Sequence, residues 1–304
     1  MDELYYYRLG MKRGGGSGGG GNTPSGGDFP IGDGNTHIWI SLAEGRTSPM
    51  LGVAVNGTVT VDWGDGTTPD VLTGTSTSTL IHTPKHEYAK PGSYVITLTV
   101  EGRVNIYGDS SRCYLLREAE NATRQRDAAY ISTIKKIEVG NNTACGNGAF
   151  CYCYSLTDVY INSNLISNVA NALFLNCSAL KNVEIAGNIT RIYSECFDGC
   201  KSLVIAYIPD AATMIGEKAF RYCEAMQEAF VPSDVATISA NAFAYCNGMK
   251  WYDFTKHTSV PTLAATNAFS SIPADCEIRV PAALVDTWKA ATNWSTYADY
   301  IVGV

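Results

Sequence analysis

The 304-residue sequence predicts a mainly β protein, in which a β-sandwich is followed by a solenoid of stacked repeats with short helical turns and a C-terminal cap. Apolar and polar residues alternate over residues 59–63 and 94–100, as they do in half-buried strands. A phenylalanine then recurs every 23 to 26 residues through the second half of the chain. Fixed spacing of this length indicates a solenoid.

The chain begins with a short arm, residues 1–12, followed by a glycine- and serine-rich linker, residues 13–27. The linker has the composition of a flexible coil, and it lacks the preceding strand and following helix of a phosphate-binding glycine loop. The arm is too short to fold alone, so we expect it to dock into another protein; the alternative is a disordered tail without a role. The expected docking residues are Leu4, Tyr5, Tyr6, Tyr7, Arg8 and Leu9.

The first residues do not have the pattern of a secretion signal. Asp2 and Glu3 stand where such a signal carries positive charge, and no apolar segment follows them. This pattern favours a protein that folds in the cytosol.

Residues 28–101 carry three motifs in order. They read WGDG at 63–66, HEY at 86–88 and PGSYVITLTV at 91–100. Together they resemble the PKD family, whose domain is an immunoglobulin-like (Ig-like) β-sandwich. The resemblance implies a rigid spacer or binding module of the kind found in surface and virion proteins.

Two groups of residues in this region have the composition of a metal site. His82 and His86 are separated by a proline that prevents a regular helix, so a structural role for His86 is favoured. Asp62, Asp65 and Asp70 suggest calcium, although Asp-Gly is equally the chemistry of a tight turn and no complete calcium loop is present. We expect no metal and no cofactor.

Residues 102–133 have only a weak period and are expected to form a connector, after which residues 134–281 form the solenoid. In each repeat, the residues at and after the phenylalanine suit a short helical turn, and a later pair of apolar residues suits a short strand. Such a unit buries its apolar faces only by stacking on its neighbours. The repeated phenylalanines are Phe150, Phe174, Phe197, Phe220, Phe243 and Phe269.

The repeats have a recognisable motif, best seen in IGEKAFRYC at residues 215–223. They resemble the BspA-type leucine-rich repeat, whose unit reads approximately IGxxAFxxCxxLxxVxIP. The resemblance implies a surface for binding and adhesion, and no particular chemistry. Cys196, in place of alanine, and Asp275, in the last copy, depart from the motif, and Asp275 puts the terminal repeat in question as a full unit.

Half of the ten cysteines occupy one repeat position, three residues after the phenylalanine. Stacking is expected to align them as a column of buried free thiols, and the sequence lacks the paired spacing of a zinc site. These cysteines are Cys153, Cys177, Cys200, Cys223 and Cys246.

Residues 282–304 are expected to cap the solenoid. A helix is predicted to start after Pro281, with Leu284, Val285 and Trp288 on one side. A cap is needed because the last strand of a solenoid exposes apolar side chains and unpaired backbone groups.

Composition excludes several functions. The net charge of −7 argues against binding to nucleic acid, and no apolar run is long enough for membrane insertion. The four histidines lie beside no plausible nucleophile, and neither GxSxG nor HExxH occurs. The sequence therefore predicts a protein that is not an enzyme.

The residue between the two apolar positions of each predicted strand points away from the core. These residues, with some of their neighbours, form a row that is aromatic and charged and that runs from Glu138 to Arg279. Such a row suits a sugar or protein ligand, and the alternative is that it covers the sheet or meets a neighbouring subunit. The expected ligand-binding residues are Tyr160, Glu184, Tyr207, Phe230, Trp251 and Asp253.

Three hypotheses about function follow from this architecture. The first is a bacteriophage virion structural protein (head fibre, decoration or tail-associated), assembled in the host cytoplasm. It would dock on other virion proteins through the arm, display its domains to a host-surface glycan or protein, and be compatible with a homo-oligomer such as a trimer. The second is a BspA-type adhesin on a bacterial cell surface. The third is a structural spacer without a ligand.

Overall fold

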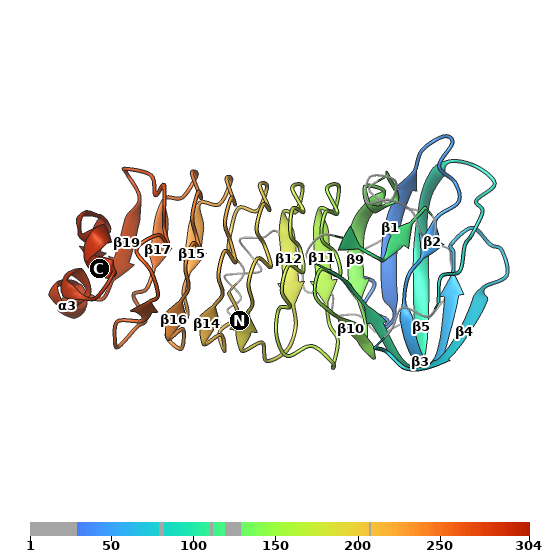
Figure 1. Ribbon diagram of the computed structural model, residues 1–304, viewed down its shortest axis with the longest axis horizontal. Helices are drawn as coiled ribbons and strands as arrows, with labels where there is room; N and C mark the ends of the chain where they lie inside the picture. Colours follow the sequence, from blue (N-terminus) through green and yellow to red (C-terminus); the bar gives the residue numbers. More distant parts are fainter. Residues whose placement is uncertain (1–28, 79–81, 110–111, 119–128, 207) are drawn as a thin grey trace.

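The computed structural model describes residues 29–78, 82–109, 112–118, 129–206 and 208–304. Figure 1 shows an elongated molecule with a β-domain at one end, a row of stacked coils, and helices at the C-terminal end. The strands of the coils run across the long axis. The predicted docking arm and its linker, as well as Tyr207, lie outside the described residues.

The β-domain is built on one antiparallel sheet in the order β1-β5-β3-β4. Its strands are β1 (Thr36–Leu42), β3 (Ala54–Asp62), β4 (Asp70–Thr75) and β5 (Gly92–Ile106). Gly57 on β3 faces Gly102 on β5, where a Cβ on Gly57 would lie 2.4 Å from the carbonyl oxygen of Glu101. Only glycine allows the two strands to approach this closely at that point.

A smaller layer covers one face of this sheet. Residues 47–53 hydrogen-bond with residues 82–88 on one side, and β2 (Met50–Leu51) pairs with β8 (Leu116–Arg117) on the other. Between the layers the indole of Trp63 is buried, and Tyr88 donates a hydrogen bond from its hydroxyl to the Trp63 carbonyl oxygen at 2.9 Å. A two-stranded ribbon of β6 (Gly108–Asp109) and β7 (Arg112–Cys113) follows β5.

The β-domain closes the first end of the solenoid. Strand β1 pairs antiparallel with β9 (Ile134–Val139), and the last residues of β5 pair in parallel with β10 (Thr143–Cys145). The structure differs here from the sequence-based division at residue 101, because β5 continues to Ile106 and β8 contributes to the smaller layer. The weak apolar period of residues 102–133 concealed these short strands.

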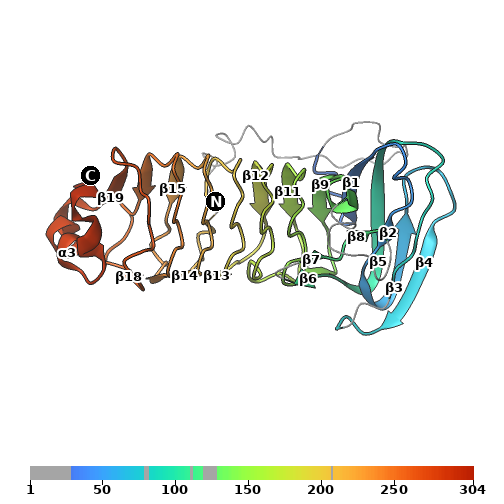
Figure 2. The same cartoon turned by 45° about the horizontal axis from the view of Figure 1, so that its top comes forward.

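Two rows of strands run along the solenoid, and Figure 2 shows them on opposite edges of the turned molecule. We call them the first and the second sheet, although each is divided: among the described residues β12 is not paired with β15, and β10 pairs with β5 and not with β13. A regular coil contributes a strand to the first sheet, a shorter strand to the second, and then the turn that carries the phenylalanine. Two coils depart from this: the coil of β11 reaches the second sheet only through the bridge of Val169, and the coil before β14 reaches the first only through the bridge of Ile205. In the first sheet, β9 is followed by β11 (Asp158–Ile161), β12 (Asn182–Ile185), β15 (Glu228–Phe230), β17 (Trp251–Asp253), β19 (Glu277–Val280) and β20 (Ile301–Gly303). In the second, β10 is followed by β13 (Arg191–Ile192), β14 (Met214–Ile215), β16 (Thr237–Ile238) and β18 (Thr262–Leu263).

The mainly β solenoid predicted from the sequence is confirmed, and the second sheet is an addition to it. Except for β10, its strands are only two residues long and place one apolar side chain in the core, as Ile215 does on β14. So short a strand shows no alternation in the sequence, which explains why the repeat predicted one strand instead of two.

The core between the sheets is a ladder of phenylalanines. Phe197 is fully buried, and its ring centroid lies 5.3 Å from that of Phe174 and 5.2 Å from that of Phe220. The repeated cysteines form a second column beside it. The thiol of Cys200 donates a hydrogen bond to the carbonyl oxygen of Phe174 at 3.2 Å, and the equivalent bond from Cys223 to Phe197 has the same length.

The C-terminal cap consists of η1 (Ala282–Leu284), α3 (Val285–Ala290) and η2 (Trp294–Tyr300). The indoles of Trp288 and Trp294 are fully buried against the last coils, and Trp294 donates a hydrogen bond from Nε1 to the Pro261 carbonyl oxygen at 2.8 Å. Across the described residues, no helix combines the length and apolar character required to cross a membrane.

Candidate functional site

The predicted ligand-binding residues form two groups on the outer surface of the first sheet. Tyr160 on β11 stands beside Glu184 on β12. Further along, Phe230 on β15 stands beside Asp253 on β17, which also carries Trp251. We call this surface the strand face. Tyr207, which would lie between the groups, falls outside the described residues.

Internal contacts already engage much of the second group. The guanidinium of Arg279 lies over the Trp251 ring, 4.5 Å from its centroid. An ion pair with Glu277 at 2.7 Å holds the guanidinium in this position. The carboxylate of Asp253 accepts hydrogen bonds from the Thr255 amide at 2.9 Å and hydroxyl at 2.6 Å. Phe230 is 38% exposed. Phe230 and the Arg279-covered Trp251 are therefore the aromatic side chains at this part of the strand face.

The predicted row begins at Glu138, which stands beside Tyr160 in register, but Glu138 is not open to solvent. Glu138 is buried, because the segment before β1 crosses the sheet at this point. Its carboxylate accepts hydrogen bonds from the backbone amides of Ile31 at 2.7 Å and Gly32 at 2.8 Å. Burial raises the pKa of Glu138 despite these bonds. Burial also raises the pKa of Tyr160, and the nearby Glu184 carboxylate adds to the effect.

The aspartates considered for calcium serve the turns of the β-domain. Asp62 accepts a hydrogen bond from the Gly64 amide at 2.8 Å, and Asp70 accepts one from the indole of Trp63 at 2.9 Å. Asp65 binds His86 Nε2 at 2.8 Å. Burial would raise the pKa of Asp65, but hydrogen bonds from Thr67 and His86 lower it overall. His86 also stacks on Trp63 with centroids 4.8 Å apart, so its contacts are structural.

The sequence reasoning missed an exposed aromatic pair on the turn edge of the solenoid. The rings of Tyr222 and Tyr245 stack with centroids 4.8 Å apart, and each residue is 39% exposed. Both have positive φ angles, 58° and 62°, which are uncommon for bulky residues. Arg221 lies 5.1 Å from the centroid of Tyr222 and pairs with Asp198 at 2.6 Å. The signal was a tyrosine two residues after the phenylalanine in two successive repeats.

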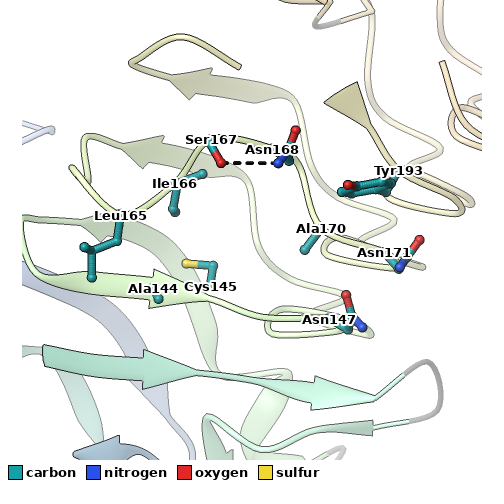
Figure 3. Close-up of a pocket in the computed structure, with 10 residues that line it drawn as sticks. All are labelled: Ala144, Cys145, Asn147, Leu165, Ile166, Ser167, Asn168, Ala170, Asn171 and Tyr193. Carbon is teal, nitrogen blue, oxygen red and sulfur yellow. Dashed lines mark hydrogen bonds between the residues drawn. The ribbon is translucent and has the colours of Figure 1, made fainter. Parts of the chain in front are cut away.

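A hollow opens on the side of the second sheet, between β10 and the loop after β11 (Figure 3). It has a volume of about 180 Å³. Asparagine, serine and tyrosine side chains line it together with small and aliphatic ones, and no lining residue is charged. The repeat motif gave no indication of this hollow, because it arises where one coil departs from the regular pattern.

Comparison with known families agrees with the repeat architecture. Residues 126–272 match the model of the BspA type leucine rich repeat region in six copies. This part of the chain is therefore a BspA-type leucine-rich repeat region. Among curated proteins, none matches the chain.

Three solved structures are similar to parts of the chain. A leucine rich cell surface protein from Faecalibacterium prausnitzii A2-165 is 26% identical over 46% of this chain and 35% of its own, with a TM-score of 0.36. A leucine-rich repeat protein from Bacteroides ovatus is 21% identical over 48% of this chain and 44% of its own, with a TM-score of 0.38. The pneumococcal vaccine antigen PcpA is 12% identical over 56% of this chain and 40% of its own, with a TM-score of 0.44. The chain thus spans less than half the length of each of these three proteins.

Proposed function

We propose that this protein is a non-enzymatic binding protein of a bacterial cell surface, and that it attaches through its solenoid to a protein or glycan of a host. The observation that carries the proposal is the BspA-type repeat region over residues 126–272, since that repeat is typical of adhesion surfaces. This is the second of the three sequence-based hypotheses. The family to which the repeats belong supports this hypothesis. The position of the attachment site on the solenoid is a separate part of the proposal.

We assign attachment to the strand face around Phe230 and Trp251. Aromatic side chains with a charged neighbour are frequent anchors in protein interfaces, because they bury a large area at a low cost in conformational entropy. Arg279, which covers the Trp251 ring, supplies that charge. In this proposal the PKD-like β-domain is a rigid spacer that closes one end of the solenoid.

Attachment can be tested with the full chain on fluorescent beads. We expect the beads to bind epithelial cell monolayers above the level of albumin-coated beads, and the Phe230→Ala, Trp251→Ala double variant to bind about tenfold less, as expected for loss of an anchor worth about 1.4 kcal/mol. Tyr245→Ala, which removes an exposed ring elsewhere, is the matched control. Binding no stronger than that of albumin beads would refute attachment, and equal binding by the double variant would refute the assigned face.

Localisation needs a separate test. Brief protease treatment of intact source bacteria should release peptides of this chain if it is displayed on their surface. Virion display instead rests on the arm, residues 1–12. Its test is deletion of residues 1–27, which should abolish incorporation into purified phage particles. Incorporation of the full chain into phage particles, together with its absence from the cell surface, would favour the virion hypothesis over the one proposed here.

A further inference from the structure

The second sheet of the solenoid is split at one place. On one side of the split, Cys145 of β10 pairs with Ile106 of β5, and on the other Val169 forms a bridge with Ile192. Within the described chain, no backbone hydrogen bond joins residues 143–145 to residues 165–169. Pairing between the two coils resumes only at the Gly148 amide, which donates to the Asn171 carbonyl oxygen at 2.9 Å. The hollow of about 180 Å³ occupies this split.

Side chains of the loop after β11 hold the split open. The Ser163 hydroxyl donates to the Thr143 carbonyl oxygen, and the Asn164 side-chain oxygen accepts a hydrogen bond from the Asn142 amide at 3.0 Å. These bonds stand where a backbone ladder would otherwise bring the two coils together. They fix the loop at a distance from β10, so the hollow is part of the folded structure.

Figure 3 shows which chemical groups line the hollow. Leu165 and Ile166 lie at one end, and Asn147, Asn171 and Tyr193 lie at the other. An amide side chain offers both donors and an acceptor, which matches the dual character of a hydroxyl group. The tyrosine ring offers an apolar face of the kind that C–H groups contact.

Two of the amides are already oriented by the protein. Asn171 Oδ1 accepts a hydrogen bond from the Ser194 amide at 3.1 Å, which leaves its NH₂ group for a ligand. Asn168 Oδ1 accepts from the Thr190 hydroxyl at 3.2 Å, while its NH₂ group donates to Ser167 at 3.2 Å. A lining that is oriented in advance loses less conformational entropy when a ligand binds.

From this lining we infer that the hollow is a binding site for one ring of a neutral sugar. An ionic ligand would lose hydration without meeting an opposite charge, since none of the lining residues is charged. The volume is below the range of about 300–1,000 Å³ typical of drug-sized ligands, so it suits a single ring. The site lies on the second sheet and does not depend on attachment through the strand face.

The test is a titration of the full chain with glucose, galactose, mannose and N-acetylglucosamine, in which saturation-transfer NMR measures the binding of each sugar. We expect at least one of them to bind saturably, with a dissociation constant on the order of 1 mM. Tyr193→Ala removes the ring, and Ala144→Phe fills the hollow without removing a lining group. Each should weaken binding by at least about tenfold. Tyr222→Ala, the same change at an exposed ring on the turn edge, should leave the affinity unchanged, and melting temperatures will establish that all variants are folded.

Several outcomes would overturn the inference. They are the absence of saturable binding by any of the four sugars, binding that both pocket variants retain, and preferential binding of glucuronate. Preferential binding of a short extended peptide would also overturn it and would indicate a strand added to the open sheet edge. None of these results bears on the bead assay, so the two proposals succeed or fail separately.

Discussion

Replacement of Phe197 by alanine should remove the centre of the phenylalanine ladder. Phe197 is fully buried and stacks on a ring in the coil before it and in the coil after it, at 5.3 and 5.2 Å. Truncation of a buried phenylalanine costs about 3–5 kcal/mol, and we expect the upper end, about 5 kcal/mol, because two stacking contacts are lost together. Since domains are typically stable by only about 5–15 kcal/mol, this is a large part of the total.

The assay is guanidinium denaturation followed by circular dichroism, with Phe230→Ala as the matched control. The control makes the same chemical change on the outer surface of the first sheet, where the residue is 38% exposed, and it should cost less than about 1 kcal/mol. Equal losses in the two variants, or a loss below about 2 kcal/mol for Phe197→Ala, would refute the claim that the stacked ladder holds the coils together.

Three further predictions concern pH, thiol reactivity and the N-terminal segment. Burial lowers the pKa of His257 below its usual 6.5, so the unfolded chain binds a proton at this imidazole more readily than the folded chain does. The contribution of the neutral, buried His257 to stability should therefore be fully present above pH 6.5 and decline as the pH falls below it. His257→Phe should flatten this dependence in denaturation experiments, and an unchanged slope would contradict it. Burial raises the pKa of thiols such as those of Cys200 and Cys223, so a thiol reagent at about pH 8 should label the folded protein slowly and all ten cysteines after unfolding; rapid labelling of the folded protein would count against a buried column. Glu138→Gln should speed amide exchange at residues 31 and 32 by at least about tenfold, since hydrogen bonds to a charged group contribute about 1.5–3 kcal/mol, whereas Glu184→Gln should not.

The repeats were predictable because the same position of every coil places a phenylalanine in the core. A buried phenylalanine with a cysteine three residues later leaves a fixed period in the sequence, and the BspA-type match over residues 126–272 confirms it. What the sequence concealed are elements defined by a partner far along the chain. The strand β10 exists because β5 lies beside it, and Glu138 is buried because residues 31 and 32 cross over it.

Site prediction had a narrower basis. Alternation along a strand correctly separates the outer side chains of Tyr160 and Phe230 from the core. Alternation does not predict that Asp253 accepts hydrogen bonds from Thr255 in the following turn, or that Arg279 covers Trp251, because these contacts depend on side-chain rotamers. The hollow beside Tyr193 depends on a break in the second sheet, and an irregular break of this kind leaves no periodic pattern in the sequence.

The direction of the strands has a mechanical consequence. The strands lie across the long axis, so the hydrogen bonds between coils point along it, and a pull on the two ends would load them one rung at a time (Figure 1). Detachment of one coil of 23 residues would release roughly 75–80 Å of chain in place of a spacing of about 5 Å. A solenoid loaded in this way would lengthen stepwise, and in the proposed function this would keep an attached molecule in place under flow.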